Sequence, residues 1–540
     1  MISIGGIDIA IIIGYLLIVI SIGLYFARNE NTSEDFFLAG RKLTWPFIGL
    51  SLFASNIGTE HLVGLAGEAY RVGLVAGGYE WIACLCLLFL AVVFIPQYLR
   101  TRIYTIPEFL ERRFSLAARM YLSVYFTVMI VLTKVSIALY AGALVVETVL
   151  GWDETTLLLG LPAKTTTMIL IGLFTGLYTA MGGLAAVVYT DALQVVVLVL
   201  GSVILTLVGL DKVGGWAGLI ENANVPVEHL SMVKPVTHPD YPITGYFIGN
   251  LFGAGMFYWC MDQSIVQRAL GAKSIDHGRK GAILAGFLKI TPVFIFVLPG
   301  VIALALFPGI ENDAAFPTMV SNLLPVGVRG IVLAGLLAAL MSSLDSTLNA
   351  SATLVTRDFI VRFSGVEPGQ RAQIWIGRVT IAIVLAAGIL CTPLIETQET
   401  LWLYLQQVSA YMGMPMAVAV FTGILWRRAN NMGALACMVV GTLLGIFMMA
   451  DSSTDGGMVG FLQADVWTSF LHRSILVAIV SIAVMISVSL ATSPPPVART
   501  EGVCYEWGRP DPERGRGISD YRVWAGILFV LVMTLWVVFR

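Results

Sequence analysis

Long apolar stretches separated by short polar loops recur along the whole sequence. Fourteen of them are predicted to be membrane-spanning helices, at 6–26, 44–70, 73–99, 118–150, 165–181, 185–210, 242–262, 278–308, 326–361, 373–396, 400–425, 433–450, 470–491 and 521–539. A transmembrane helix needs about 20 apolar residues. The segments are too long for strands, and they lack the alternating pattern of a barrel. The chain is therefore predicted to be an all-α integral membrane protein.

The basic residues predict how the chain is oriented. Most of the 32 lysines and arginines lie in loops that follow odd-numbered segments, among them Arg28, Arg100, Arg268, Arg427 and Arg509. Loops rich in Lys and Arg remain in the cytoplasm. Both termini are therefore predicted to lie outside, together with the polar loop 211–241.

Two segments carry interruptions in the middle of the membrane. The second contains the polar stretch 54–61, and the seventh contains glycines and an asparagine at 249–255. Irregular backbone at this depth persists only where it lines a cavity or is buried in protein, although tight glycine packing is the alternative for either stretch alone. An odd number of spans inverts a second copy, so segments 2–6 and 7–11 are predicted to form an inverted repeat around a midplane substrate site.

This repeat divides the chain into five predicted parts. They are 1–43, the first helix and an inner loop; 44–210, the first five-helix repeat; 211–241, the outer loop; 242–425, the second repeat; and 426–540, three extra C-terminal helices. Neither 211–241 nor the inner connector 492–520 is long enough to be a catalytic domain.

Composition narrows the classes of function. The 540 residues are 57% hydrophobic and only 12% charged, with a mean hydropathy of +0.85, whereas soluble domains carry about 25% charged residues. Disorder and a soluble enzyme are excluded. The net charge is −2 and no polybasic arm occurs, so no nucleic-acid partner is expected. The histidines and cysteines have no metal-ligand spacing and no Walker lysine is present; the six cysteines are predicted to be buried thiols.

A cation site is predicted in the ninth segment. Ser342, Asp345 and Ser346 share one helix face, while Ser343 points about 100° away. Hydroxyls, carboxylates and carbonyls are hard oxygen donors that suit Na⁺; helix packing is the alternative for the serines. An intramembrane carboxylate needs a cation, a partner or a proton. Asp191 is a second such group, unless it lies at the interface or caps its helix.

Polar and aromatic residues inside other segments predict a ligand site. Lys289 lies too deep to reach the membrane surface easily, so it should face the bundle interior, either in a site or in a structural ion pair; Lys134 is similar. Aromatic rings beside amides and carboxylates suit a neutral polyhydroxy ligand. The candidates with this chemistry are Glu80 with Tyr79 and Trp81, the stretch 258–263 with Tyr258, Trp259, Asp262 and Gln263, and the pair Gln406 and Gln407. Any single aromatic is more simply explained by core packing or an interface belt.

Several of these stretches resemble one known family. The chain is similar over nearly its whole length to the solute:sodium symporter family, in particular its sodium/glucose cotransporter branch. The resemblance rests on DFFLAGR at 35–41, SLFASNIG at 51–58, GGYEW at 77–81, YTIPEFL at 104–110, MGGL at 181–184, YWC at 258–260 with Asp262 and Gln263, SSL at 342–344 with Asn349, and LWRR at 425–428 with Gly433 and Ala434.

The resemblance implies a LeuT-type five-plus-five inverted repeat with extra helices, and it implies roles for single residues. By position, the main sodium site would use backbone oxygens of Ala54, Ile57 and Ala339 with the hydroxyls of Ser342 and Ser343. The substrate site would use Asn56, His61, Tyr79, Glu80, Lys289 and Gln406, with Tyr258 and Trp259 as gate or platform. A second sodium site would use Asp191, Ser342, Asp345 and Ser346.

Three positions depart from the family's pattern. Gly255 and Ala83 stand where some bacterial sugar carriers have an Asn and a Ser, which weakens the case for galactose or glucose in particular. Asp345 replaces a small residue or Thr. It would strengthen a second sodium site, favour two Na⁺ per substrate or bind a proton.

Together these features predict a sodium-coupled symporter that imports a hexose-like sugar by alternating access. The alternative substrates are myo-inositol, another polyol and a sugar acid. A sodium-dependent sensor or channel is a further alternative, and an enzyme is not expected. The expected partners are the substrate, Na⁺ and the lipid bilayer of a plasma or inner membrane, without an obligate protein partner.

Overall fold

The computed structural model describes residues 5–27, 32–58, 60–150, 152, 156–158, 160–364, 368–392, 401–452, 459, 467–506, 515 and 517–540. Nearly all of these residues are helical. The strands among them are β1 (Leu157–Leu158) and β2 (Leu161–Pro162), which form one antiparallel pair. Arg28 and Arg509, which the orientation argument uses, lie outside the described residues.

Helices occupy every predicted segment, and several segments combine α-helical and π-helical (η) parts. In chain order they are α1 (Gly6–Ala27); α3 (Trp45–Asn56), η2 (Glu60–Leu65) and α4 (Ala66–Val72); α5 (Gly78–Phe89), η4 (Leu90–Phe94) and α6 (Ile95–Thr101); α8 (Leu116–Met129), η5 (Ile130–Val135) and α9 (Ser136–Leu150); α10 (Ala163–Val213); η7 (Gly245–Ala254) and α12 (Gly255–Met261); α14 (Ile275–Leu288), η8 (Val293–Val297) and α15 (Leu298–Leu306); α17 (Val328–Leu354), η10 (Val355–Ile360) and α18 (Val361–Phe363); α19 (Gln370–Cys391); α20 (Leu401–Leu425); α21 (Asn431–Ser452); α22 (Phe470–Ala491); and α23 (Tyr521–Val538). Short helices between them are α2 (Ser33–Leu38), α7 (Ile106–Arg113), α11 (Gly215–Glu221), α13 (Gln263–Leu270) and α16 (Ala315–Leu323).

Ten of the described helices are long and apolar enough to cross a membrane, so the chain is a multi-pass membrane protein. The first segment has a shorter apolar stretch, Gly6–Ile22. The fifth and sixth segments lie in the single run of α10, which bends at Gly183 (φ 48°, ψ −154°), a backbone conformation that glycine adopts without a Cβ clash. The number of fourteen crossings stays a prediction.

The interruption in the second segment is confirmed, and the one in the seventh lies elsewhere than predicted. After α3, Ile57 is extended (φ −84°, ψ 101°), and helix resumes at Glu60. In the seventh segment the glycine-rich stretch continues as η7 into α12, and the chain leaves the helix only at Asp262 (φ −65°, ψ 125°). A Cβ on Gly249 would lie 2.4 Å from the Leu471 carbonyl oxygen, so this glycine serves close helix packing.

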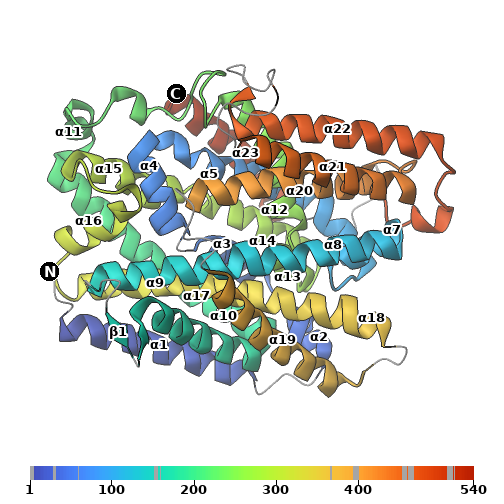
Figure 1. Cartoon of the computed structure of the whole chain (residues 1–540), viewed down its shortest axis with the longest axis horizontal. Helices are drawn as coiled ribbons and strands as arrows, with labels where there is room; N and C mark the ends of the chain where they lie inside the picture. The colour runs from blue at the N-terminus through green and yellow to red at the C-terminus, as the bar shows by residue number, and fades with distance from the viewer. Residues whose placement is uncertain are drawn as a thin grey trace.

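Several long helices, among them α1, α8, α9, α21 and α22, run roughly along the longest axis of the molecule (Figure 1). α10 packs against α17, α1 and α3, α14 packs against α3, and α20, α21 and α22 pack together. The two chain ends contact segments at one end of this bundle. The Asp8 carboxylate accepts hydrogen bonds from the backbone amides of Gly327 and Gly330, and the Phe539 carbonyl accepts one from Met232 in the 211–241 loop. Which end faces outside stays a prediction.

Several arginines that sequence reasoning assigned to loops are buried. Arg113 and Arg268 are fully buried. The Arg113 guanidinium donates to the carbonyls of Gly423, in the last turn of α20, and of Trp426 and Ala429, just after that helix. Because a buried guanidinium needs several acceptors, these side chains hold helix ends together. The assignment of Arg268 to a cytoplasmic loop is therefore wrong.

Candidate functional site

A cavity in the middle of the bundle brings the predicted substrate residues together. It lies between the helices η2, α5, η5, α12, α14, α17 and α20 and the break that follows α3. All eight predicted residues line it, namely Asn56, His61, Tyr79, Glu80, Tyr258, Trp259, Lys289 and Gln406. Ala83 and Gly255, two of the departures from the family's pattern, line it as well.

A buried charge network forms one wall of the cavity. Lys289 follows the last residue of α14, and its ammonium group contacts both the Glu80 carboxylate and the Asn56 side-chain oxygen. His61 Nε2 lies 3.4 Å from Glu80 Oε1, and the Asn56 amide donates to the Tyr258 hydroxyl over 3.1 Å. Lys289 therefore forms the predicted ion pair and also lines the cavity, while its role in binding a substrate stays a prediction.

Aromatic rings frame the same wall. The Trp402 ring lies 5.4 Å from His61 and 5.8 Å from Tyr79, both edge-on. The Tyr79 hydroxyl and the Trp402 indole nitrogen are buried and have no hydrogen-bond partner among the described residues. Trp402 lines the cavity one turn before Gln406 on α20, and sequence reasoning missed it. The signal that could have identified Trp402 was its position one helical turn before the candidate Gln406.

A second ion pair lies on another side of the cavity. Lys134 Nζ is 2.6 Å from Asp262 Oδ2 and 2.7 Å from Ser264 Oγ, and it lies 5.3 Å from the centre of the Tyr258 ring. All four residues line the cavity. Each lysine that lines the cavity is thus paired with a carboxylate.

The residues of the expected main sodium site lie where α3 ends and α17 passes. Ala54 and Ile57 belong to the last turn of α3 and its break, and Ser342 and Ser343 lie on α17, which packs against α3. Ala339 is buried one turn earlier on α17. The Ser343 hydroxyl is buried without a hydrogen-bond partner in the described part of the chain, so its lone pairs remain available for a cation.

A cluster of carboxylates and serines lies beside this region. Asp191 is fully buried and accepts hydrogen bonds of 2.5 Å from both Ser51 Oγ and Ser342 Oγ. Asp191 lies inside α10, so its predicted alternative as a helix cap is wrong. Asp345 is also fully buried and accepts from Ser346 Oγ over 3.3 Å. The predicted second-site residues lie together because α10 and α17 pack along each other.

Arg268 completes this cluster, and sequence reasoning missed its role as it missed that of Trp402. Its guanidinium donates to Ser51 Oγ over 3.3 Å and to Ser346 Oγ, and it faces the charges of Asp191 and Asp345. The signal was weak, because an arginine just beyond an apolar segment is typical of a cytoplasmic loop.

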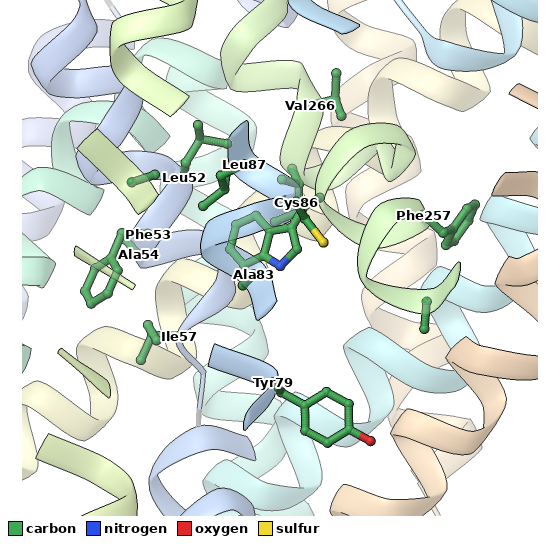
Figure 2. Close-up of a cluster of buried hydrophobic side chains, with 14 of the residues drawn as sticks. Leu52, Phe53, Ala54, Ile57, Tyr79, Ala83, Cys86, Leu87, Phe257 and Val266 are labelled. Carbon is green, nitrogen blue, oxygen red and sulfur yellow. The ribbon is translucent and has the colours of Figure 1, made fainter. Parts of the chain in front are cut away.

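Apolar packing fixes the spacing between the cavity and the cluster. Figure 2 shows side chains of α3, α5, α12 and α13 meeting in one buried group that includes Leu52, Phe53, Ala54, Ile57, Ala83, Cys86, Leu87, Phe257 and Val266. Tyr79 is labelled in the same view, and its ring packs edge-on against Tyr241, Tyr246 and Trp402. A close-packed interior of this kind transmits small displacements instead of absorbing them.

Comparison with known proteins agrees with this geometry. A sequence model of the sodium:solute symporter family matches residues 36–441. Sodium/glucose cotransporter 4 from Danio rerio is 34% identical, over 95% of this chain and 83% of that protein. The sodium/myo-inositol cotransporter from Mus musculus is 35% identical, over 81% of this chain and 66% of that protein.

Solved structures share the fold. A Na⁺-coupled sialic acid symporter, in a substrate-bound outward-open state, superimposes with a TM-score of 0.78 at 22% identity, covering 91% of this chain and 99% of that one. A transporter of the nucleobase-cation-symport-1 family superimposes with a TM-score of 0.57 at 15% identity, covering 88% and 99%.

Proposed function

The chain belongs to the sodium:solute symporter family, and we propose that it uses a sodium gradient to import a neutral sugar, a glucose-like or galactose-like hexose. Its relatives include sodium/glucose cotransporters at 33–34% identity over most of the chain. Alternating access around the midplane cavity would carry the sugar across a plasma or inner membrane.

The charge balance of the cavity carries the proposal that the substrate is neutral. Lys289 is paired with Glu80, and Lys134 is paired with Asp262. A substrate carboxylate would need an unpaired cation or would displace a buried partner, and an unpaired buried charge is costly. A sugar acid, one of the predicted alternatives, is therefore disfavoured.

Uncharged polar groups in the cavity suit a polyol. The Tyr79 hydroxyl and the Trp402 indole N–H lack partners among the described residues, and leaving such groups buried and unsatisfied costs about 1–3 kcal/mol each. Sugar hydroxyls would satisfy both, while the Trp402 ring offers an apolar face. Asn56, His61, Glu80, Lys289 and Gln406 would bind the remaining hydroxyls, with Tyr258 and Trp259 as gate or platform.

Myo-inositol is the second candidate substrate. It is also a neutral ring of hydroxyls, so the paired lysines and the free Tyr79 and Trp402 groups fit it equally well. Sodium/myo-inositol cotransporters are 35% identical to this chain. A competition panel separates the two candidates.

Sodium would bind at the break of α3. We assign the main site to backbone oxygens of Ala54, Ile57 and Ala339 and to the hydroxyls of Ser342 and Ser343. The support is the Ser343 hydroxyl, which has no partner among the described residues, on a helix that packs against α3, and the extended backbone at Ile57 where α3 ends. Sodium at this position would hold the broken helix in the shape that binds sugar, and this differential binding is the coupling. Each charge that crosses 100 mV supplies about 2.3 kcal/mol.

A second cation would bind at the serine–carboxylate cluster. Asp191 and Asp345 are fully buried, and serine hydroxyls of α3 and α17 donate to them. Carboxylates and hydroxyls are hard oxygen donors that suit a monovalent cation. The cation, Na⁺ or a proton, would use Asp191, Ser342, Asp345 and Ser346.

The wider organisation follows the family fold. We propose fourteen crossings, both termini outside, and a five-plus-five inverted repeat formed by 44–210 and 242–425, flanked by 1–43, 211–241 and 426–540. The interruptions at Ile57 and Asp262 support this repeat, since each follows the first helix of one half. No catalytic activity and no obligate protein partner form part of the proposal.

The decisive experiment is uptake into proteoliposomes. A panel of hexoses, myo-inositol and a uronate would be tested with and without an inward sodium gradient. We expect a neutral sugar or polyol to accumulate above equilibrium only with sodium. Equal uptake without sodium would contradict symport, and sodium-dependent flux without accumulation would indicate a channel.

A further inference from the structure

The short helix α13 connects the substrate cavity to the cation cluster. It spans Gln263–Leu270, and all eight residues are buried. Asp262, which precedes the helix, lines the cavity, and Arg268, near its other end, lies in the cluster. A single rigid element therefore carries a charged side chain into each site.

The cavity end of α13 is held by an ion pair. Asp262 caps the helix, because its Oδ1 accepts from the Ser264 backbone N–H over 2.9 Å. Its Oδ2 binds the Lys134 ammonium group, which also contacts Ser264 Oγ and faces the ring of Tyr258. Tyr258 in turn accepts a hydrogen bond from Asn56 at the end of α3. The Asp262–Lys134 pair is thus linked through Tyr258 to Asn56, a residue of the proposed sugar site.

The cluster end of α13 is held by Arg268. Its guanidinium donates to Ser51 on α3 and to Ser346 on α17, and its third contact is the Ser264 carbonyl. Ser264 therefore takes part at both ends, through its hydroxyl toward Lys134 and through its carbonyl toward Arg268. A displacement of Arg268 must move the first turn of α13 or break this hydrogen bond.

We propose that α13 couples the cation cluster to the substrate cavity, with Arg268 and Asp262 as its positioning residues. This inference rests on the proposed sodium-coupled symport. A cation that joins Asp191 and Asp345 competes with the guanidinium for the same carboxylates and serines. Arg268 then shifts, and the close-packed helix passes the shift to the Asp262–Lys134 pair beside Tyr258.

The coupling is measurable as a ratio of affinities. Sugar affinity of the purified, full-length protein is measured by equilibrium binding at zero and at saturating Na⁺. In the wild type, sodium is expected to raise it on the order of tenfold. By thermodynamic linkage, sugar must raise sodium affinity by the same factor.

Two variants test the two ends of α13 separately. Asp262→Asn keeps the helix-capping oxygen and removes the charge that holds Lys134. Arg268→Lys keeps the positive charge and loses the planar fork that reaches two serines at once. Both should reduce the sodium effect on sugar affinity to about threefold or less.

The matched control is Arg279→Lys. This buried arginine donates to the Ala91 carbonyl and lies over the Tyr521 ring, away from both sites. It should retain the wild-type ratio. A purely structural defect would lower sugar affinity with and without sodium by one common factor and leave the ratio unchanged.

Each outcome decides the inference. A wild-type ratio in both test variants would overturn it, and if Arg268→Lys does not fold, Asp262→Asn decides alone. An absence of any sodium effect in the wild-type protein would instead refute the proposed symport, so the two failures are distinguishable.

Discussion

The cavity and the cation cluster are both buried, but they balance their charges differently. In the cavity each lysine has one carboxylate, as in the Lys289–Glu80 pair. In the cluster, the buried carboxylates of Asp191 and Asp345 lie near the buried guanidinium of Arg268. Because neither lysine of the cavity is left without a carboxylate, the cavity should prefer a neutral ligand to an anion, whereas the carboxylates and serine hydroxyls of the cluster suit a monovalent cation. Glu60 is a third carboxylate on the cavity wall, so the pairing of the lysines, and not burial or the sum of the charges, distinguishes the two sites.

The largest expected effect comes from breaking the balance of the cavity. Lys289→Met leaves Glu80 buried without its cation, a change that costs about 3–5 kcal/mol. Sugar uptake should fall by at least about a hundredfold, and the melting temperature should drop. The double variant Lys289→Met/Glu80→Gln removes both charges and should recover much of the stability. A single variant that keeps normal uptake and stability would contradict the assignment.

Removing the orphaned hydroxyl at the α3 break should have a smaller and more selective effect. Ser343→Ala deletes a proposed sodium ligand, and the loss of one such contact, about 1–1.5 kcal/mol, should raise the half-saturating sodium concentration about tenfold. Uptake at low sodium should collapse. Since this hydroxyl has no partner among the described residues, thermal stability without sodium should not fall. An unchanged sodium dependence would remove Ser343 from the site.

Neutralising one carboxylate should weaken the proposed second cation site. Asp345→Asn removes the charge of one of its two carboxylates, so the second cation should no longer bind. The charge that moves per sugar, measured as current against tracer uptake in the same membranes, should fall from two to one. The comparison between the sites would be wrong if the wild type already moves a single charge per sugar.

The smallest expected effect on stability comes from Asp313, a carboxyl group outside both sites, which serves as a reference. Asp313 lies in the connection between α15 and α16, where burial, with the nearby charges of Glu68 and Glu311, raises its pKa to about 6. Its protonated form is favoured in the fold, so its contribution makes the protein less stable as pH rises from about 4 to about 6. Asp313→Asn should raise the melting temperature slightly at pH 7.5 and have little effect near pH 4.5. An equal shift of the melting temperature at both pH values would exclude the raised pKa of Asp313 as its cause.

Much of the architecture could be predicted because it depends on local composition. Apolar length located every segment, and the polar run near Ile57 located the first helix break. The depth of Lys289 in its segment indicated that it faces the interior. The glycines at 249–255 misled the prediction of the second break, because glycine serves close packing as readily as irregular backbone. The break at Asp262 needs only one extended residue, which leaves no compositional trace.

The pattern of apolar segments was enough to predict a multi-pass helical membrane protein, and it placed Lys289 and Asp345 inside the bundle, since both follow from the cost of placing polar groups in an apolar solvent. It did not place Arg268 there, and how the buried charges pair depends on the tertiary structure. Lys134 with Asp262, and Arg268 with Ser51 and Ser346, are contacts between segments that are distant in the chain. Such contacts depend on how α3, α13 and α17 pack, and no local pattern encodes that packing.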